Sequence, residues 1–241
     1  MSDEMANRKL SLVKAIRMME RVDLLDMNGH ISCRLAEGDS RFLINARAAS
    51  RATLTTSDVV VCNADGTPEP GGPEPPSEVY IHTEIYRQRP DVYAIVHNHP
   101  HWQTVLGIAD LPLKPVFSIG SFSQFVPYYE RSSLVNEREM GEELARALAG
   151  HRAIQIRHHG SVVVGGSVEE VFATAVFMEE NAKKQYQTYL VNRNHHVLEG
   201  ENLKRTQETN WSPKIVRKVW TYHEEKSLIS GHLNGLQAHE R

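Results

Sequence analysis

Short apolar runs with the two-residue period of a β-strand alternate along this chain with longer segments that have the period of an amphipathic helix. Because the two kinds of segment are interspersed, the sequence predicts an α/β fold in which helices cover a sheet. The expected helices are 7–25, 78–88, 137–148, 167–190 and 214–222, and the expected strands are 30–35, 41–44, 59–62, 92–96, 153–157 and 161–164. No repeat or linker interrupts this pattern, so we expect a single domain over residues 1–241, with a core of about 10–190 and a C-terminal extension over 191–241.

Charge and apolar content exclude several classes of protein. The chain has 27 Lys and Arg against 30 Asp and Glu, a net charge of −3 that argues against a nucleic-acid partner. No apolar run approaches the ~20 residues of a membrane helix, and the mixed charges of Met1–Arg8 are unlike a signal peptide. Cys33 and Cys62 are too few for a disulfide framework, although one bridge between them stays open. We therefore expect a cytoplasmic protein that binds neither nucleic acid nor a membrane.

Four side chains have the spacing of a metal site. His97 and His99 end a predicted strand, and the two-residue period puts both imidazoles on one face. His159 ends a second predicted strand and precedes Gly160, which lets the chain turn sharply. Glu78 opens a predicted helix nineteen residues before the first of these histidines. Three neutral imidazoles and one carboxylate suit Zn²⁺, or leave open positions on a larger ion such as Mn²⁺. A chance His-x-His in a chain with 13 histidines is the competing explanation.

The same residues, taken with their flanking sequence, resemble the class II aldolase/adducin family. The likeness rests on Glu78, on His97-Asn-His-Pro100 and His158-His-Gly160, and on Asn28-Gly-His-Ile-Ser32, which is similar to the family's Gly-Asn-x-Ser segment. It covers about Leu10 to Leu190. The resemblance implies a three-layer α/β/α sandwich on a mainly antiparallel central sheet, assembled as a homotetramer with active sites at subunit interfaces.

The resemblance also implies roles for individual residues. His97, His99 and His159 carry over as metal ligands, and Glu78 carries over as a ligand that can leave the metal to act as acid or base. The segments similar to the family's substrate-binding motifs supply further residues that we expect to bind substrate. These are Asn28, His30, Ser32 and Ser77.

Departures from the sugar-phosphate members of the family favour a different substrate. Their phosphate-binding Thr-Gly turn and the first Ser of their Ser-Ser-Glu correspond here to Asn45-Ala-Arg-Ala-Ala-Ser-Arg51 and Pro76-Ser-Glu78. Arg47 and Arg51 suit flat carboxylates through bidentate hydrogen bonds, so we expect them to bind substrate. For either arginine alone, a solvated surface position is an equally good interpretation.

The catalytic tyrosine of the aldolases, expected near Phe117-Ser118, has no clear counterpart, and Tyr128, Tyr129 and Tyr189 stay open as substitutes. In these departures the sequence resembles a branch of the family that decarboxylates hydroxy-aromatic and hydroxy-pyridine dicarboxylates. We therefore favour a metal-dependent carbon–carbon lyase that decarboxylates such a small-molecule dicarboxylate.

Loss of CO₂ leaves an electron pair on carbon, and a divalent ion lowers the barrier by accepting that charge. Glu78 and His101 are the candidates to protonate the carbon, since both should lie close to the ion. Trp102 could face a planar substrate or pack in the core. Two other functions stay open: an aldolase, epimerase or dehydratase acting on a sugar phosphate, and a non-catalytic adducin-like interaction module. The retained metal-site residues count against the second.

Overall fold

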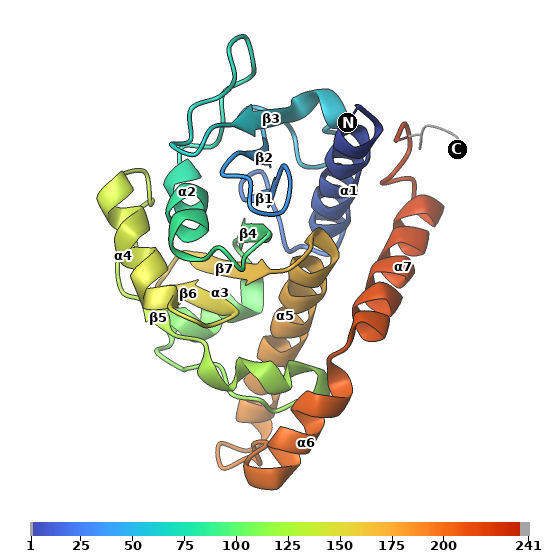
Figure 1. Cartoon of the computed structure of the whole chain (residues 1–241). Coiled ribbons are helices and arrows are strands. Elements are labelled where there is room, and N and C mark those ends of the chain that lie inside the picture. Colours follow the sequence, from blue (N-terminus) through green and yellow to red (C-terminus); the bar gives the residue numbers. More distant parts are fainter. Residues whose placement is uncertain (1, 237–241) are drawn as a thin grey trace.

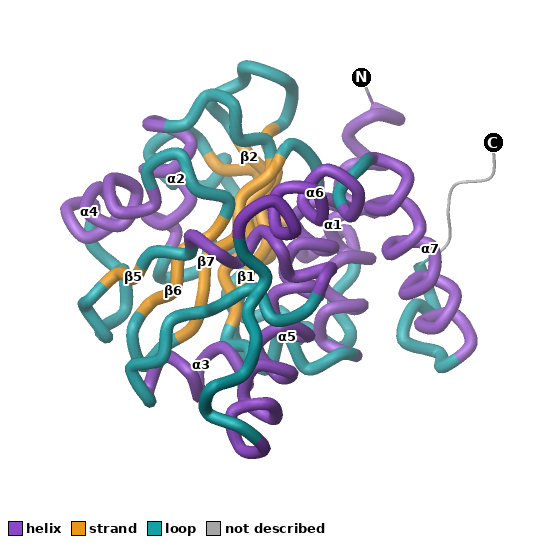
Figure 2. The backbone as a smooth tube through the Cα atoms, turned by 90° about the horizontal axis from the view of Figure 1, so that it is seen from below, coloured by secondary structure: helices purple, strands orange, loops and turns teal. Residues whose placement is uncertain are grey.

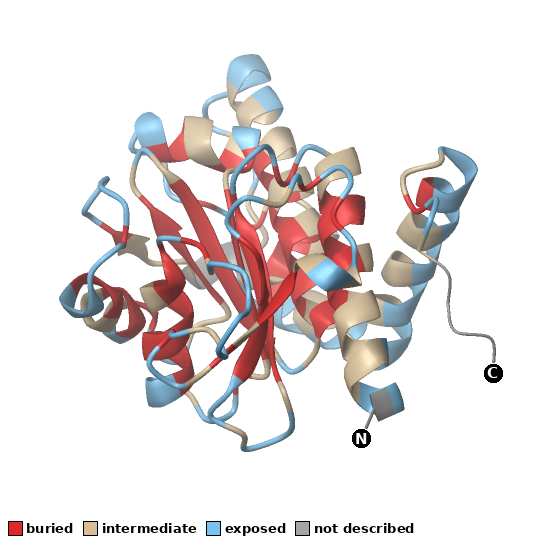
Figure 3. Ribbon diagram, turned by 90° about the horizontal axis from the view of Figure 1, so that it is seen from above, coloured by how far each residue is buried: buried red, intermediate tan, exposed pale blue. Residues whose placement is uncertain are grey.

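The computed structural model describes residues 2–236 and has one mixed sheet at its centre. The strands are β1 (His30–Arg34), β2 (Phe42–Asn45), β3 (Val59–Cys62), β4 (Ala94–Asn98), β5 (Tyr128–Tyr129), β6 (Ala153–Ile156) and β7 (Gly160–Gly165). They lie in the order β3-β2-β1-β4-β7-β6-β5, and every neighbouring pair is antiparallel except β5 and β6, which are parallel. The strands form the buried middle layer of the molecule (Figure 3).

Helices cover both faces of this sheet (Figure 1, Figure 2). The helices are α1 (Ser2–Arg21), α2 (Val79–Gln88), α3 (His101–Ile108), α4 (Arg138–Leu148), α5 (Val168–Val191), α6 (Gly200–Asn210) and α7 (Pro213–Ile229), with two short 3₁₀ helices, η1 (Thr56–Asp58) and η2 (Ser118–Phe125). Helices α2 and α4 lie on one face, α1 and α5 lie on the other, and α7 packs outside α1 and α5. The expected α/β sandwich on a mainly antiparallel sheet is therefore confirmed.

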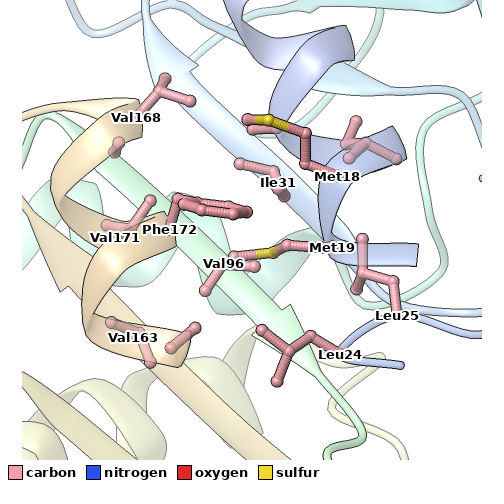
Figure 4. Packing of buried hydrophobic residues seen from close by; sticks show 14 of the residues in the cluster. Met18, Met19, Leu24, Leu25, Ile31, Val96, Val163, Val168, Val171 and Phe172 are labelled. Atoms are coloured by element: carbon pink, nitrogen blue, oxygen red, sulfur yellow. The ribbon is translucent and has the colours of Figure 1, made fainter. Parts of the chain in front are cut away.

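The apolar core between the sheet and the α1–α5 layer follows from the alternation of strand β1. Ile31 and Cys33 lie on the face of β1 that joins this core, together with Met18 and Met19 of α1 and Phe172 of α5 (Figure 4). Fully burying one such large side chain stabilises the fold by about 1.5–3 kcal/mol. The sheet is thus anchored to two long helices through side chains that alternate along one strand.

Two element boundaries near the histidines differ from the sequence prediction. Helix α2 begins at Val79 with Glu78 as its N-cap, whereas the expected helix 78–88 included Glu78. Although Glu78 is the N-cap, its carboxylate makes no cap bond, and its Oε1 instead accepts a hydrogen bond from the N–H of Val135. Strand β4 extends to Asn98 instead of ending at Val96, so His97 lies inside the sheet.

The C-terminal extension contains more helix than the range 214–222 predicted. Ser212 caps α7 by accepting a hydrogen bond from the N–H of Ile215, and Pro213 occupies the first turn, where proline is favoured. Helix α6 was missed because Leu203 is its one fully buried residue, so its apolar period is weak. Helix α6 contacts η2, and α7 contacts α1 and α5.

Cys33 and Cys62 are buried free thiols, so the bridge that the sequence left open is not formed between them. Burial raises the pKa of each thiol to about 12, which keeps both protonated and unreactive at neutral pH. Over residues 2–236, no helix combines the length and the apolar character that a membrane span requires.

Candidate functional site

Strand β4 places His97 at the centre of the sheet. His97 pairs with His30 of β1 on one side and Val162 of β7 on the other, and its side chain is completely buried. Its Nδ1 lies 3.0 Å from the carbonyl oxygen of Ser161, which can only accept, so Nδ1 carries the hydrogen. The Nε2 lone pair is therefore left for another partner, as it commonly is in a histidine that binds a metal.

His97, His99 and His159 form a compact cluster, here called the histidine triad. Their ring centroids are 4.9 Å apart for His97 and His99 and 5.0 Å apart for the other two pairs. The Nε2 atoms of His97 and His99 are 3.2 Å apart, and one nitrogen from each of the three rings lies within 4.8 Å of the others. The structure therefore brings together the three imidazoles that the sequence spacing singled out.

His159 reaches the triad from the tight turn between β6 and β7. His158 adopts the left-handed conformation in this turn, with φ 58°. The sequence analysis expected Gly160 to provide the sharp turn, and this was wrong. A Cβ on Gly160 would lie 2.2 Å from the backbone oxygen of Asn98 and 2.9 Å from Cδ2 of His99. Glycine is required there because strand β4 approaches so closely, and this approach brings the segments of the triad together.

Glu78 brings a carboxylate to the same point from the start of α2. Its Oε2 lies 3.5 Å from Nε2 of His97 and 3.9 Å from Nε2 of His159, and its Oε1 accepts a hydrogen bond of 2.9 Å from the N–H of Val135. Burial alone would raise the pKa of this carboxyl, but the neighbouring imidazoles and the Val135 N–H lower it to about 2. A buried carboxylate therefore faces the triad.

The electrostatics of the triad suit a divalent cation. Burial and the neighbouring His97 lower the pKa of His159 to about 4 and shift the pKa of His99 in the same direction. Both rings are therefore neutral at pH 7 and carry a lone pair that an ion can accept. Nδ1 of His99 also lies 3.6 Å from Oδ1 of Asp26, an outer carboxylate of the kind that orients ligating histidines. Three imidazoles and one carboxylate match the donors that Zn²⁺ and Mn²⁺ use.

Behind the triad, between β1 and α2, lies a second group of buried polar residues, here called the polar column. It consists of His30 and Ser32 on β1 and His82 and Tyr86 on α2, which are hydrogen-bonded to one another. His30 and Ser32 were expected to bind substrate, but the sequence analysis missed His82 and Tyr86. The signal that could have found them is their four-residue spacing, which puts both on one face of a helix that follows a polar-faced strand.

The polar column meets the triad at His30. The ring of His30 lies 5.0 Å from that of His97, and ligand atoms of His30, Glu78 and His97 lie within 4.8 Å of one another. Ser32 is completely buried and bonded within the column, so it is linked to the triad through His82 and then His30.

The two arginines expected to bind substrate have different environments. Arg51 is buried, and its guanidinium donates to the carbonyl oxygens of Gly29, over 2.9 Å, and of Ala49. These bonds tie the loop after β2 to the turn before β1, which gives Arg51 a structural role. Arg47 is exposed on the same loop, which is fixed by a 2.9 Å bond from its N–H to the carbonyl oxygen of Glu74. Of the two, Arg47 is the one that reaches solvent.

The remaining expected site residues lie at the surface of the chain. Asn28, Ser77 and His101 are exposed. His101 is the first residue of α3, and its ring lies edge-on to that of Trp102, with centroids 4.8 Å apart. Trp102 is half-buried and also contacts the ring of Tyr186 at 5.1 Å, which favours the packing role for this tryptophan.

The three tyrosines considered as substitutes for a catalytic tyrosine are engaged with residues outside the triad. Tyr128 donates to the carbonyl oxygen of Leu111 over 3.0 Å, and Tyr129 donates to a carboxylate oxygen of Glu143 over 3.2 Å. The ring of Tyr189 contacts that of His195, with centroids 5.9 Å apart. Over residues 2–236, these contacts give none of the three a link to the triad.

Comparison of this chain with known proteins finds a matching family and similar enzymes. The model of the Class II Aldolase and Adducin N-terminal domain matches residues 11–186. A 3,4-dihydroxyphthalate decarboxylase of Arthrobacter keyseri is 30% identical over 191 residues, covering 72% of this chain and 75% of that protein. An L-fuculose phosphate aldolase of Escherichia coli O6:H1 is 28% identical over 180 residues, covering 73% of this chain and 80% of that protein.

A solved structure shows the same architecture. An aldolase II superfamily protein from Pseudomonas syringae superimposes with a TM-score of 0.83, over 96% of each chain and at 23% identity. At this identity the likeness concerns the fold.

Proposed function

This chain belongs to the class II aldolase and adducin family, and from that membership we propose that it is a metal-dependent carbon–carbon lyase. The observation that carries the proposal is the histidine triad with the Glu78 carboxylate 3.5 Å from His97. His97, His99 and His159 would hold Zn²⁺ or Mn²⁺, with Glu78 as a further ligand. A divalent ion bound there supplies a Lewis acid for the negative charge that develops as a carbon–carbon bond breaks.

The reaction that we propose is decarboxylation of a hydroxy-aromatic or hydroxy-pyridine dicarboxylate. The relative from Arthrobacter keyseri, named as a decarboxylase of dihydroxyphthalate, supports this choice. So does the loop after β2, where exposed Arg47 stands in place of a phosphate-binding turn and can form two parallel hydrogen bonds to a carboxylate. Arg51 contributes indirectly, by holding this loop against Gly29, next to His30.

Glu78 is the residue that we propose to move the proton. The Val135 N–H binds its Oε1, which leaves Oε2 directed at the triad. The Glu78 carboxyl is ionised in the free protein, so it would first take up a proton from solvent and then deliver it to the substrate carbon after CO₂ leaves. His101 stays as the alternative acid, exposed at the first residue of α3.

We further propose a homotetramer in the cytoplasm, with each active site at a subunit interface. The expected substrate residues Asn28, Ser77 and His101 are exposed on the protomer, which supports a site completed by a neighbouring subunit. Size-exclusion chromatography with light scattering should report four chains. A monomer at micromolar concentration would count against the interface site.

The second candidate function is aldol cleavage of a sugar phosphate, which the fuculose phosphate aldolase relative favours. A panel assay separates the two reactions: purified protein loaded with Zn²⁺ or Mn²⁺ is offered 3,4-dihydroxyphthalate, a hydroxy-pyridine dicarboxylate and L-fuculose 1-phosphate. We expect CO₂ from at least one dicarboxylate and no cleavage of the phosphate. Cleavage of the sugar phosphate without CO₂ release would replace the decarboxylase assignment by the aldolase.

Arg47 offers a sharper test of the substrate class. Arg47→Ala should weaken binding of the dicarboxylate by ~1.5–3 kcal/mol, the usual range for a hydrogen bond to a charged group. Arg41→Ala, at another exposed arginine, is the matched control and should leave the KM unchanged. Normal dicarboxylate binding by the Arg47→Ala protein would remove the support that this residue gives. Arg51→Ala is unsuitable because it breaks the bonds that hold the loop.

A further inference from the structure

The polar column forms a continuous hydrogen-bonded chain from His30, beside the histidine triad, to the backbone carbonyl of Tyr93. Nδ1 of His30 lies 2.6 Å from Nε2 of His82, and Nδ1 of His82 lies 2.6 Å from Oγ of Ser32. Oγ of Ser32 lies 2.8 Å from the hydroxyl oxygen of Tyr86, which lies 3.2 Å from the carbonyl oxygen of Tyr93. All four side chains of the column are at most 5% exposed.

The carbonyl at the end of the chain sets the direction of every bond in it. A carbonyl oxygen can only accept, so the Tyr86 hydroxyl donates to it and accepts from the hydroxyl of Ser32. Ser32 then has to accept from Nδ1–H of His82, which leaves Nε2 of His82 without a hydrogen. That nitrogen accepts from Nδ1–H of His30. The hydrogen of His30 is thereby placed on Nδ1, away from the triad.

The other ring nitrogen of His30, Nε2, is the one that remains available to a substrate. This nitrogen is buried and has no hydrogen-bond partner within the described residues, and His30 shares a cluster of ligand atoms with Glu78 and His97. We propose that the polar column holds His30 in the Nδ1–H tautomer, so that its Nε2 lone pair accepts a hydrogen bond from a substrate hydroxyl beside the triad. His82, Ser32 and Tyr86 are then positioning residues that act through His30.

This assignment deepens the proposed function and rests on it for the identity of the substrate. An aromatic acid with a hydroxyl next to its carboxylate presents a hydrogen that an acceptor nitrogen can bind. In the opposite tautomer, Nε2–H would favour an anionic oxygen and would leave that hydroxyl without its acceptor. The column therefore selects a hydroxy acid over the same acid without the hydroxyl.

Within this chain of bonds His82 donates through Nδ1 and accepts through Nε2, so its ring carries one hydrogen. The variable in the column is therefore the position of a hydrogen and not a charge.

The test is a variant that removes the end of the chain. In Tyr86→Phe, the Ser32 hydroxyl loses its acceptor and should turn to donate to Nδ1 of His82, which reverses both imidazoles. The Tyr93 carbonyl keeps its 2.9 Å bond from the N–H of Arg34, so that group stays paired. Tyr80→Phe, on the same helix and outside the column, is the matched control.

Nitrogen NMR of histidine-labelled full-length protein distinguishes the two tautomers, and the His30 signals are assigned by their loss in His30→Gln. We expect Nδ1–H in the wild type and in Tyr80→Phe, and Nε2–H in Tyr86→Phe. Ser32→Ala, which disconnects the column from its end, should give a mixture. Nε2–H in the wild type, or the same tautomer in the wild type and Tyr86→Phe, would overturn the assignment.

Binding measurements on the Zn²⁺-loaded protein test the role of Nε2. Wild type should bind 2-hydroxybenzoate about tenfold more tightly than benzoate, the factor for one good hydrogen bond, and Tyr86→Phe should lose this preference. No preference in the wild type, or a metal-type shift of His30 Nε2 on addition of Zn²⁺ alone, would show that the lone pair does not serve a hydroxyl. Neither measurement needs turnover, so a protein that passes both and releases no CO₂ contradicts the proposed reaction and leaves the column intact.

Discussion

The two faces of strand β1 show two ways in which a protein interior is specified. On the face toward α1 and α5, Ile31 and Cys33 are packed among apolar side chains such as Phe172 (Figure 4). On the face toward α2, His30 and Ser32 are equally buried but hydrogen-bonded to polar partners. The apolar face depends on volume, so side chains of similar shape can replace one another. The polar face depends on which atom carries each hydrogen, so the loss of one atom changes the whole chain of bonds.

The largest effect should be on metal affinity, after removal of imidazoles from the triad that the polar face meets. Removing both His97 and His99 by substitution with Ala should lower metal affinity by more than about 100-fold, beyond what outer-shell changes cause, because two of three imidazole ligands are lost. Metal content after dialysis measures this. His196→Ala, at an exposed histidine, is the control. Stoichiometric metal in the double variant would contradict the site.

Phe172→Ala instead removes a large side chain that packs against the apolar face of β1. It should lower the free energy of unfolding by about 3–5 kcal/mol, because it leaves a cavity among fully buried side chains. Denaturant titration measures the loss. The folded fraction should keep its metal, since Phe172 lies on the face opposite the polar column. Loss of metal from folded Phe172→Ala would show that the two faces are coupled.

Two adjacent residues compare the faces within one strand. Ser32→Ala removes a hydroxyl that His82 and Tyr86 both use, and each buried partner left unpaired costs about 1–3 kcal/mol. Cys33→Ala removes one sulfur from the apolar face and should cost about 1 kcal/mol. Denaturation midpoints of the two variants give the comparison. A larger loss for Cys33→Ala would reverse the ranking of the faces.

The acid sensitivity of the metal-free protein offers a further comparison of the two faces. Burial lowers the pKa of His82 to about 3 and that of His223, which contacts Phe172 on the opposite side, to about 4. Below the usual histidine value of 6.5 the unfolded chain takes up protons that the folded protein resists. Stability should therefore be full above pH 6.5 and fall as the pH drops from 6.5 toward 4. Melting temperatures should flatten over this window in His82→Gln and in His223→Gln. An unchanged slope in both variants would contradict the burial explanation.

The triad could be predicted from the sequence because its determinants are local. His97 and His99 follow from the period of one strand, and His159 follows from a second strand end. The sequence analysis missed His82 and Tyr86 of the polar column, because only the packing of α2 on β1 brings them to His30 and Ser32. For the same reason, the sequence could not separate buried Arg51 from exposed Arg47. The difference lies in backbone carbonyls that Arg51 meets only in the folded chain.

The central claim is that the triad supports release of CO₂ from a hydroxy-aromatic dicarboxylate, and isotope release tests it most directly. Carboxylate-labelled 3,4-dihydroxyphthalate is incubated with the wild type after chelation of bound metal, and again after Zn²⁺ or Mn²⁺ is restored. The account predicts labelled CO₂ and a matching amount of monocarboxylate in the restored sample, and neither product in the chelated one. Intact substrate in both samples, from a protein that cleaves L-fuculose 1-phosphate when metal is restored, would contradict it.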